Sequence, residues 1–203
     1  MPLSSAGFEA WIEVEGKETR YYEPEDLDDS DGQTCWIVSE LDKAFSIHWR
    51  NEDVFIQTAG RIWVDGVECS GEILRGPGKT SISGRRTSGT TLAPFIFSSM
   101  NLTDDDAFLD TAPDKDLGLI KLEVWAISYT GETKAFPNAK APSQSKIHER
   151  SKKSGAHQTK FGDPVMEVSR GAAVVEYLQS TPLATFTFKY RSLDLLQAND
   201  IAP

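Results

Sequence analysis

The chain has 203 residues, a formal net charge of −10 and 39% hydrophobic residues, among them five Trp, five Tyr and ten Phe. This composition excludes a disordered chain, and the length allows a core that needs neither disulfides nor metal for stability. The sequence has no apolar stretch long enough to span a bilayer and no recognisable secretory signal at its start. We therefore expect a single domain over residues 1–203, in an intracellular protein of the nucleus or cytoplasm with no membrane partner.

The first half of the chain contains a series of short segments typical of β-strands. In Phe8–Val14 apolar and polar residues alternate, which is the period of a strand with one buried face. Asp65-Gly66 is a strong signal for a two-residue hairpin turn between two further strands. The other strands expected in this half lie at residues 34–38, 44–49, 54–56, 61–64, 67–74 and 94–97.

The second half begins with the longest expected strand, at residues 117–129, and ends with strands at 172–178 and 183–190. Phe186 and Phe188 alternate with polar residues, which predicts that both face the core. At Ser192 the strand period gives way to a short helix, for which Ser192 is a suitable N-cap. We expect Leu193 and Leu196 of this helix to cover one open end of the fold.

Residues 130–165 interrupt the strand pattern. Their first part resembles a linker, and Ser145–Gly155 is interpreted as a short basic helix capped by Ser145 and closed by Gly155. Together the segments predict an all-β fold, an antiparallel β-sandwich or jelly roll of about ten strands. A short basic helix in the long excursion and a short C-terminal helix complete this expectation.

Charge is distributed unevenly along the chain. Residues 1–32 hold ten acids and two cations, whereas residues 134–160 hold seven cations and one acid. The basic segment could meet phosphates or an acidic partner, but a body of net charge −10 disfavours nucleic acid through long-range repulsion. We expect a protein partner; the alternative is a solvated segment that pairs with acids of the body. The candidate contacts in this segment are Lys146, Arg150, Lys152, Lys153 and His157.

Trp11 and Trp63 each lie on the face of their strand opposite the main apolar set. Exposure of either ring would imply a ligand or subunit contact, so both join the candidate partner-binding residues. All five Trp could instead form a platform for stacking sugars, although aromatics at strand period are more often part of a core.

The motifs that usually indicate catalysis, metals or nucleotides are incomplete here. Gly76–Thr80 resembles a phosphate loop, but Ile73 stands where the motif needs Gly, and no helix is expected after it. The acidic segment Asp26–Gly32 fails as an EF-hand, and the three His have no partners at metal-ligand spacing. There is no nucleophile elbow of the Gly-x-Ser-x-Gly kind. We expect no catalytic, cofactor-binding or metal-binding residues, and hence a protein that is not an enzyme.

The two cysteines, Cys35 and Cys69, both lie in expected strands. Free cysteines are often buried, and intracellular disulfides are rare, so two reduced and buried thiols are expected. A Cys35–Cys69 bridge remains the alternative.

Segments from both ends and the middle of the chain together resemble a family of uncharacterised fungal proteins. They are Gly7–Val14 with Tyr22, Cys35–Glu40, Leu102–Asp106, Leu117-Gly118 with Trp125, Gly155–His157 with Phe161-Gly162, Phe188–Arg191 and Ile201–Pro203. The resemblance spans nearly the whole chain and implies a single β-rich domain in a nuclear or cytoplasmic setting. It implies no catalytic residues.

The expected function is therefore a non-catalytic intracellular module that binds a protein partner through its loops, the 130–165 excursion or an exposed sheet face. Two alternatives remain open. One is an acidic jelly-roll chaperone for basic proteins such as histones, and the other is a carbohydrate-binding sandwich.

Overall fold

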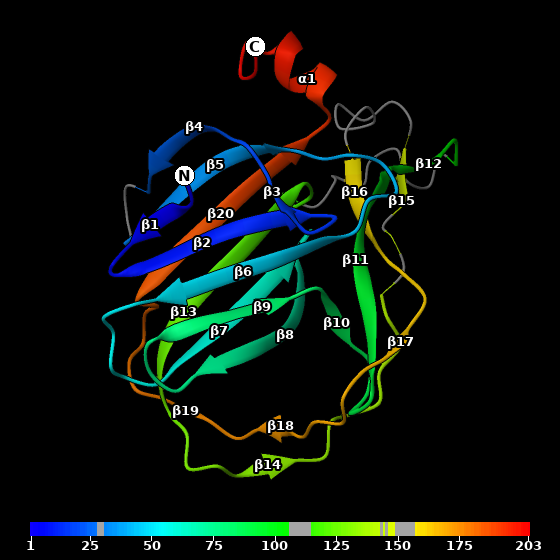
Figure 1. Cartoon of the computed structure of the whole chain (residues 1–203). Helices are drawn as coiled ribbons and strands as arrows, with labels where there is room; N and C mark the ends of the chain where they lie inside the picture. The colour runs from blue at the N-terminus through cyan, green and yellow to red at the C-terminus, as the bar shows by residue number, and fades with distance from the viewer. Residues whose placement is uncertain (28–30, 106–114, 143, 145, 149–156) are drawn as a thin grey trace.

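The computed structural model describes residues 1–27, 31–105, 115–142, 144, 146–148 and 157–203 (Figure 1). Its strands form two sheets packed face to face and a third sheet at one end. No helix among these residues is long and apolar enough to cross a membrane.

The first layer, called here the small sheet, is antiparallel throughout. Alternation of apolar and polar residues in its two central strands gives it one buried side. Its strands, in spatial order, are β1 (Leu3–Ser5), β2 (Phe8–Val14), β6 (Phe45–Asn51) and β9 (Gly78–Ile82), with β3 (Lys17–Glu18) paired to β2.

The second layer, called the large sheet, is mixed. Its closing strand β20 (Ala184–Arg191) pairs in parallel with β5 (Gly32–Val38) on one side and antiparallel with β13 (Leu119–Ser128) on the other. The end of the chain is thereby placed in the centre of the layer. The spatial order is β4 (Tyr21–Asp26), β5, β20, β13, β7 (Thr58–Val64) and β8 (Val67–Leu74), with β19 (Glu176–Tyr177) paired to β13.

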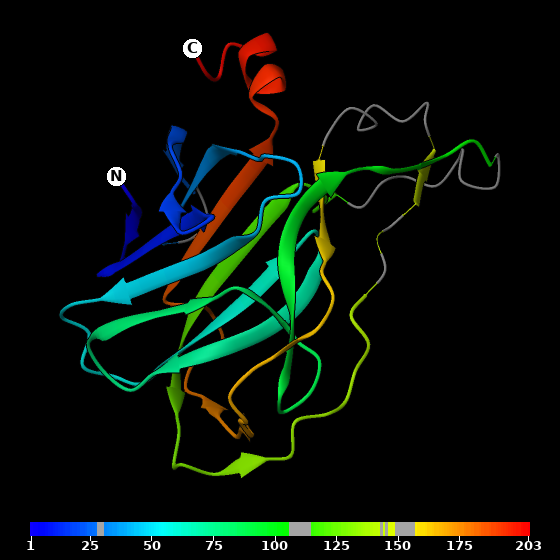
Figure 2. The same ribbon diagram turned by 45° about the vertical axis from the view of Figure 1, so that its right-hand side comes forward.

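A third sheet is built around β11 (Thr91–Ser99), which stands at a steep angle to the strands of both layers (Figure 2). It also contains β10 (Gly84–Arg86), β16 (His157–Phe161) and β17 (Val165–Met166). Two short pairs and one helix complete the described elements. They are β12 (Asn101–Thr103) with β15 (Lys146–His148), β14 (Thr133–Lys134) with β18 (Ala172–Ala173), and α1 (Leu193–Ala198).

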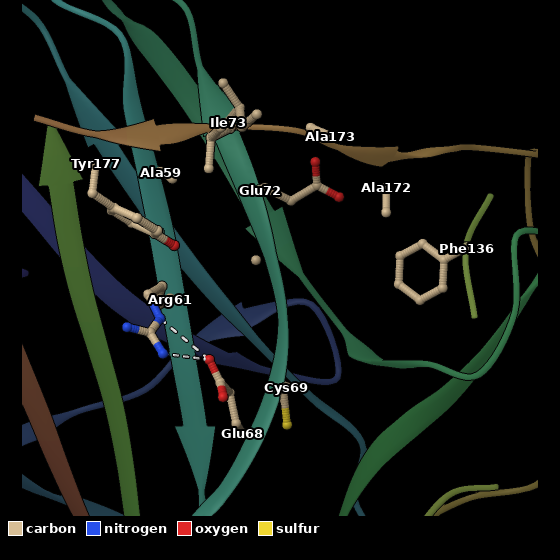
Figure 3. Close-up of a pocket in the computed structure, with 13 residues that line it drawn as sticks. Ala59, Arg61, Glu68, Cys69, Glu72, Ile73, Phe136, Ala172, Ala173 and Tyr177 are labelled. Carbon is tan, nitrogen blue, oxygen red and sulfur yellow. Dashed lines mark hydrogen bonds and ion pairs between the residues drawn. The ribbon is translucent and has the colours of Figure 1, made fainter. Parts of the chain in front are cut away.

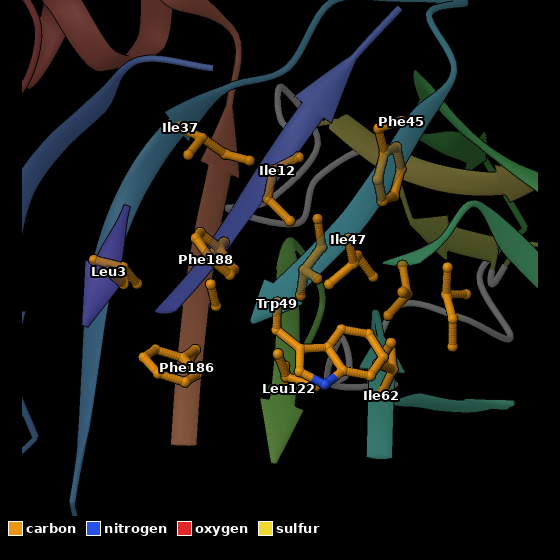
Figure 4. Packing of buried hydrophobic residues seen from close by; sticks show 14 of the residues in the cluster. Leu3, Ile12, Ile37, Phe45, Ile47, Trp49, Ile62, Leu122, Phe186 and Phe188 are labelled. Atoms are coloured by element: carbon orange, nitrogen blue, oxygen red, sulfur yellow. The ribbon is translucent and has the colours of Figure 1, made fainter. Parts of the chain in front are cut away.

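The core lies between the two layers (Figure 4). Ile47 and Trp49 of the small sheet face Leu122 and Phe188 of the large sheet, and all four are 0% exposed. Phe45 stacks on Phe97 of β11 with 4.3 Å between ring centroids, which joins the third sheet to the same core. This is face-to-face packing of two sheets across one apolar layer.

The all-β sandwich expected from the sequence is confirmed. Phe186 and Phe188 are both fully buried. Asp65 and Gly66 have φ values of 51° and 79°, as a primed two-residue hairpin turn requires. The hydroxyl of Ser192 accepts a hydrogen bond from the Leu195 N–H at 3.4 Å, so it is the N-cap of α1.

Four local expectations are wrong. Residues 54–56 form no strand but lie in the connection that crosses from the small to the large sheet, where Phe55 is 81% exposed. Leu196 is buried but Leu193 is 41% exposed, because α1 projects beyond the end of β20 (Figure 1). Residues 146–148 pair with β12 as strand β15 and are not helical, while the rest of the expected basic helix, residues 145 and 149–155, lies outside the described residues. Residues 130–165, expected to interrupt the strand pattern, contain strand β16, which pairs with β11 along its whole length.

Candidate functional site

Three of the five Trp lie part-exposed on the outer side of the large sheet. Strand alternation explains this placement, because each Trp sits between neighbours whose side chains enter the core. Cationic side chains occupy the outward positions between them. We call this surface the aromatic face, made of Trp36, Trp63, Trp125, Arg61, Lys121, Lys189 and Arg191.

The cations of the aromatic face lie over its rings. Lys121 Nζ is 4.3 Å from the centroid of Trp63, and the Arg61 guanidinium is 4.8 Å from the same ring. Lys189, opposite Trp36 in the register of β20 and β5, lies 5.0 Å from the centroid of Trp36. Such cation–π contacts hold long side chains against the sheet while their charges remain accessible to water.

Carboxylates offset part of this positive charge. Arg61 pairs with Glu68 at 2.7 Å, and that hydrogen bond raises the pKa of Arg61. Lys121 pairs with Glu123 at 3.0 Å. Glu123 also accepts the indole N–H of Trp125 at 3.0 Å, and its side chain is only 16% exposed. The most exposed of these carboxylates are Glu68, at 56%, and Glu25, at 65%, which lies 3.8 Å from Lys189.

Trp63 therefore lies where a partner could reach it, but Trp11 does not. Trp11 faces outward from the small sheet yet is only 7% exposed. It stacks on His48 at 5.3 Å between centroids and lies under Lys79, whose Nζ is 4.8 Å from its centroid. The expectation of an exposed Trp11 contact is corrected, because its neighbours cover the ring.

The predicted basic contacts are not gathered into one site among the described residues. Lys146 begins β15, and His157 begins β16, where its Nδ1 lies 2.8 Å from the hydroxyl of buried Ser39. Arg150, Lys152 and Lys153 lie outside the described residues. Trp11, Trp63 and His157 belong to three different sheets.

His48 has neighbours that resemble a hydrolytic triad in composition but not in geometry. Its Nε2 lies 2.7 Å from the Ser46 hydroxyl and 3.4 Å from Glu13, while its buried Nδ1 has no hydrogen-bond partner. In a triad the acid and the nucleophile engage opposite ring nitrogens. Burial lowers the pKa of His48. Within the described residues, no group of three or more His, Cys, Asp or Glu could hold a metal ion.

A cleft that the sequence did not indicate lies over β7 and β8. Residues 170–177, called the strap, cross over these two strands and cover the cleft (Figure 3). Three adjoining cavities of about 230, 300 and 200 Å³ all have Glu72 in their walls. Ala172, Ala173 and Tyr177 of the strap face Arg61 and Glu68 across the first of them (Figure 3).

Both cysteines are free and buried. Cys69 lies in the wall of the first cavity, and burial raises its pKa to about 12. Burial likewise raises the pKa of Cys35 to about 12. Both groups are therefore neutral thiols at physiological pH and poor nucleophiles.

Fold and surface together define an all-β sandwich whose large sheet carries an aromatic and cationic outer face. A family model described as Domain of unknown function (DUF7918) matches residues 7–203, and the chain belongs to this family. The resemblance drawn from the sequence is confirmed at this level, while a fungal origin stays a prediction. No curated protein and no solved structure matches the chain.

Proposed function

We propose that this protein is a non-catalytic interaction module of the nucleus or cytoplasm that binds an acidic segment of a protein partner across the aromatic face. The observation that carries the proposal is the set of part-exposed Trp rings with cations lying over them on one sheet face. Interfaces are enriched in Trp and Arg, and their strongest contacts come from such residues.

Charge supports an acidic partner. Among the described residues the aromatic face holds four cations against the three carboxylates paired with them, so it is net positive on a protein of net charge −10. Glu25 and Glu68 are mostly exposed, and carboxylates of a partner could replace them at Lys189 and Arg61 without disturbing the sheet. A short acidic segment carries far less charge than a nucleic acid, and salt screens its repulsion from the body within about 8 Å.

The test measures binding of a fluorescently labelled Glu-rich peptide by anisotropy, with a Lys-rich peptide of equal length and a single-stranded oligonucleotide as comparisons. We expect only the Glu-rich peptide to bind, and to bind more weakly as salt rises. Lys121→Glu should weaken binding by at least about tenfold, because it turns an attraction at the centre of the face into a repulsion.

Lys79→Glu is the matched control. Lys79 also lies over a Trp ring, that of Trp11, but on the small sheet, and its reversal changes the net charge equally. Equal loss of binding in both variants would show that only net charge matters and would contradict a site on the aromatic face. Absence of binding to the Glu-rich peptide at low salt would also contradict it.

A chaperone for basic proteins is the second candidate, favoured by the acidic edge strand β4. Glu23, Glu25 and Asp26 are all exposed at this edge of the large sheet. A basic protein would meet them there rather than on the aromatic face. Binding of the Lys-rich peptide and of core histones, unaffected by Lys121→Glu, would favour this function over the first.

Carbohydrate binding is less well supported by the geometry. Sugars stack on open aromatic faces, whereas Lys121 and Arg61 both lie over Trp63. A sugar would have to displace a cation from the ring before it could stack. A glycan array with clear binding would reverse this ranking.

A further inference from the structure

The second cavity of the cleft has a wall rich in arginine. It measures about 300 Å³ and lies between β8 and the strap, next to the cavity of Figure 3. Four charged side chains line it, and three of them are cationic: Arg75, Arg86 and Arg170, with Glu72 the fourth. We call it the arginine cavity.

Two of these arginines are already neutralised. Arg170 forms an ion pair with Glu72 at 2.5 Å. Arg86 is 7% exposed and pairs with Glu167 at 3.1 Å, while a second N–H donates to the carbonyl of Gly89 at 3.2 Å. Glu167 lines the adjoining cavity of about 200 Å³. The buried Arg86 thus has a carboxylate beside it, as a buried charge requires, and Arg170, whose side chain is 49% exposed, is paired as well.

Arg75 is the third arginine of the cavity. No ion pair to a carboxylate is found for it among the described residues, and its guanidinium lies 5.0 Å from the ring centroid of Tyr129. Tyr129 lines the same cavity, as does Phe136. With Glu72 and Glu167 counted against three guanidinium groups, the site has one uncompensated positive charge beside two aromatic side chains.

We propose that the arginine cavity binds a small aromatic carboxylate, whose charge meets Arg75 where it lies over Tyr129 and whose ring lies against Phe136. Size permits this, since a dry protein cavity of about 150 Å³ already accommodates benzene. The charge selects a monoanion: a carboxylate carries one negative charge at neutral pH, whereas a phosphate monoester carries about 1.5 to 2. A guanidinium is suited to bidentate recognition of a carboxylate.

The experiment is calorimetric titration of the whole chain with benzoate. Benzyl alcohol tests the need for charge, benzylamine tests its sign, and phenyl phosphate tests the choice of carboxylate over phosphate. We expect benzoate to bind, and the other three to bind at least about tenfold more weakly. Absence of heat with benzoate, or equal binding of benzyl alcohol, would overturn the proposal. Tighter binding of phenyl phosphate would replace the carboxylate with a phosphate.

Arg75→Gln is the decisive variant. Arg75 is exposed, so its loss should leave the fold intact, which an unchanged melting temperature would verify. We expect benzoate affinity to fall at least about tenfold in Arg75→Gln. Arg50→Gln, which removes an arginine paired with Glu9 on the small sheet, should leave it unchanged. Unaltered binding in Arg75→Gln would contradict the proposal.

The inference is independent of the proposed acidic partner. Lys121→Glu alters the aromatic face but no residue of the arginine cavity, so it should weaken peptide binding and leave benzoate binding intact.

Discussion

Asp65 shows how much one residue can specify in this fold. It occupies the first position of the β7–β8 turn with a positive φ, as its place before Gly66 predicts. Its carboxylate also accepts the Tyr190 hydroxyl at 2.7 Å and the backbone N–H groups of Gly118 and Thr159, each at 2.7 Å. A single side chain thus joins a hairpin, the start of β13, the closing strand and the third sheet.

Tyr190→Phe should destabilise the protein by about 1–3 kcal/mol, because it leaves the buried carboxyl group of Asp65 without one of its hydrogen-bond donors. Tyr190 is 0% exposed, so water cannot readily replace the hydroxyl. The free energy of unfolding in urea measures the effect. Tyr22→Phe on the edge strand β4 is the control, with a change expected within about 0.5 kcal/mol. Equal values for the two variants would show that the Asp65 network contributes nothing measurable.

At the scale of elements, turns are fixed by backbone conformation as much as by packing. The β2–β3 hairpin turns at Glu15 and Gly16, whose φ values are 50° and 75°. A Cβ placed on Gly16 would meet no atom within 4 Å, so only the left-handed conformation favours glycine there. A Cβ placed on Gly76, between β8 and β9, would also meet no atom within 4 Å, but Gly76 does not adopt the left-handed conformation.

This pair of glycines gives a clean test. Gly16→Ala should cost about 1–2 kcal/mol through left-handed strain alone. Gly76→Ala should be neutral or stabilise the fold by up to about 1 kcal/mol, because it restricts only the unfolded chain. Thermal unfolding of the two variants measures both. A stabilising Gly16→Ala would contradict the turn conformation described here.

Elements whose signal is local could be predicted from the sequence. Phe186 and Phe188 alternate with polar neighbours, which predicts their burial, and Ser192 precedes a helical stretch, which predicts an N-cap; the structure confirms both. Leu193 is expected to cover the open end of the fold together with Leu196, but its exposure depends on how far α1 extends past the sheet, which no local pattern encodes.

At the scale of the whole molecule, the missed features are those assembled from distant strands. Trp36, Trp63 and Trp125 each follow the alternation of their own strand, but their common face depends on β20 entering between β5 and β13. The arginine cavity likewise joins β8 to a strap almost a hundred residues later, as the Glu72–Arg170 pair shows. Strand order cannot be read from periodicity, so neither surface could be predicted.

The stability of the whole molecule should depend on pH through two histidines in different sheets. Burial lowers the pKa of both His48 and His157 below the usual 6.5. In His48, Lys79 also lowers the pKa while Glu13 opposes this; in His157, Arg191 lowers it and the bond to Ser39 opposes this. Both rings are therefore neutral in the folded protein at pH values where the unfolded chain has begun to take up protons.

Stability should accordingly be fully present above pH 6.5 and decline as pH falls from there toward the lowered folded-state pKa values, because the unfolded state binds more protons in that window. Melting temperatures measured from neutral to mildly acidic pH should fall, and the fall should be smaller in the double variant His48→Gln, His157→Gln. Burial raises the pKa of Asp65 and of Glu72, so these carboxyl groups act in the opposite direction as pH falls, and the comparison with the double variant isolates the part due to the histidines. An identical pH dependence in the double variant would mean that the two histidines do not couple protonation to folding.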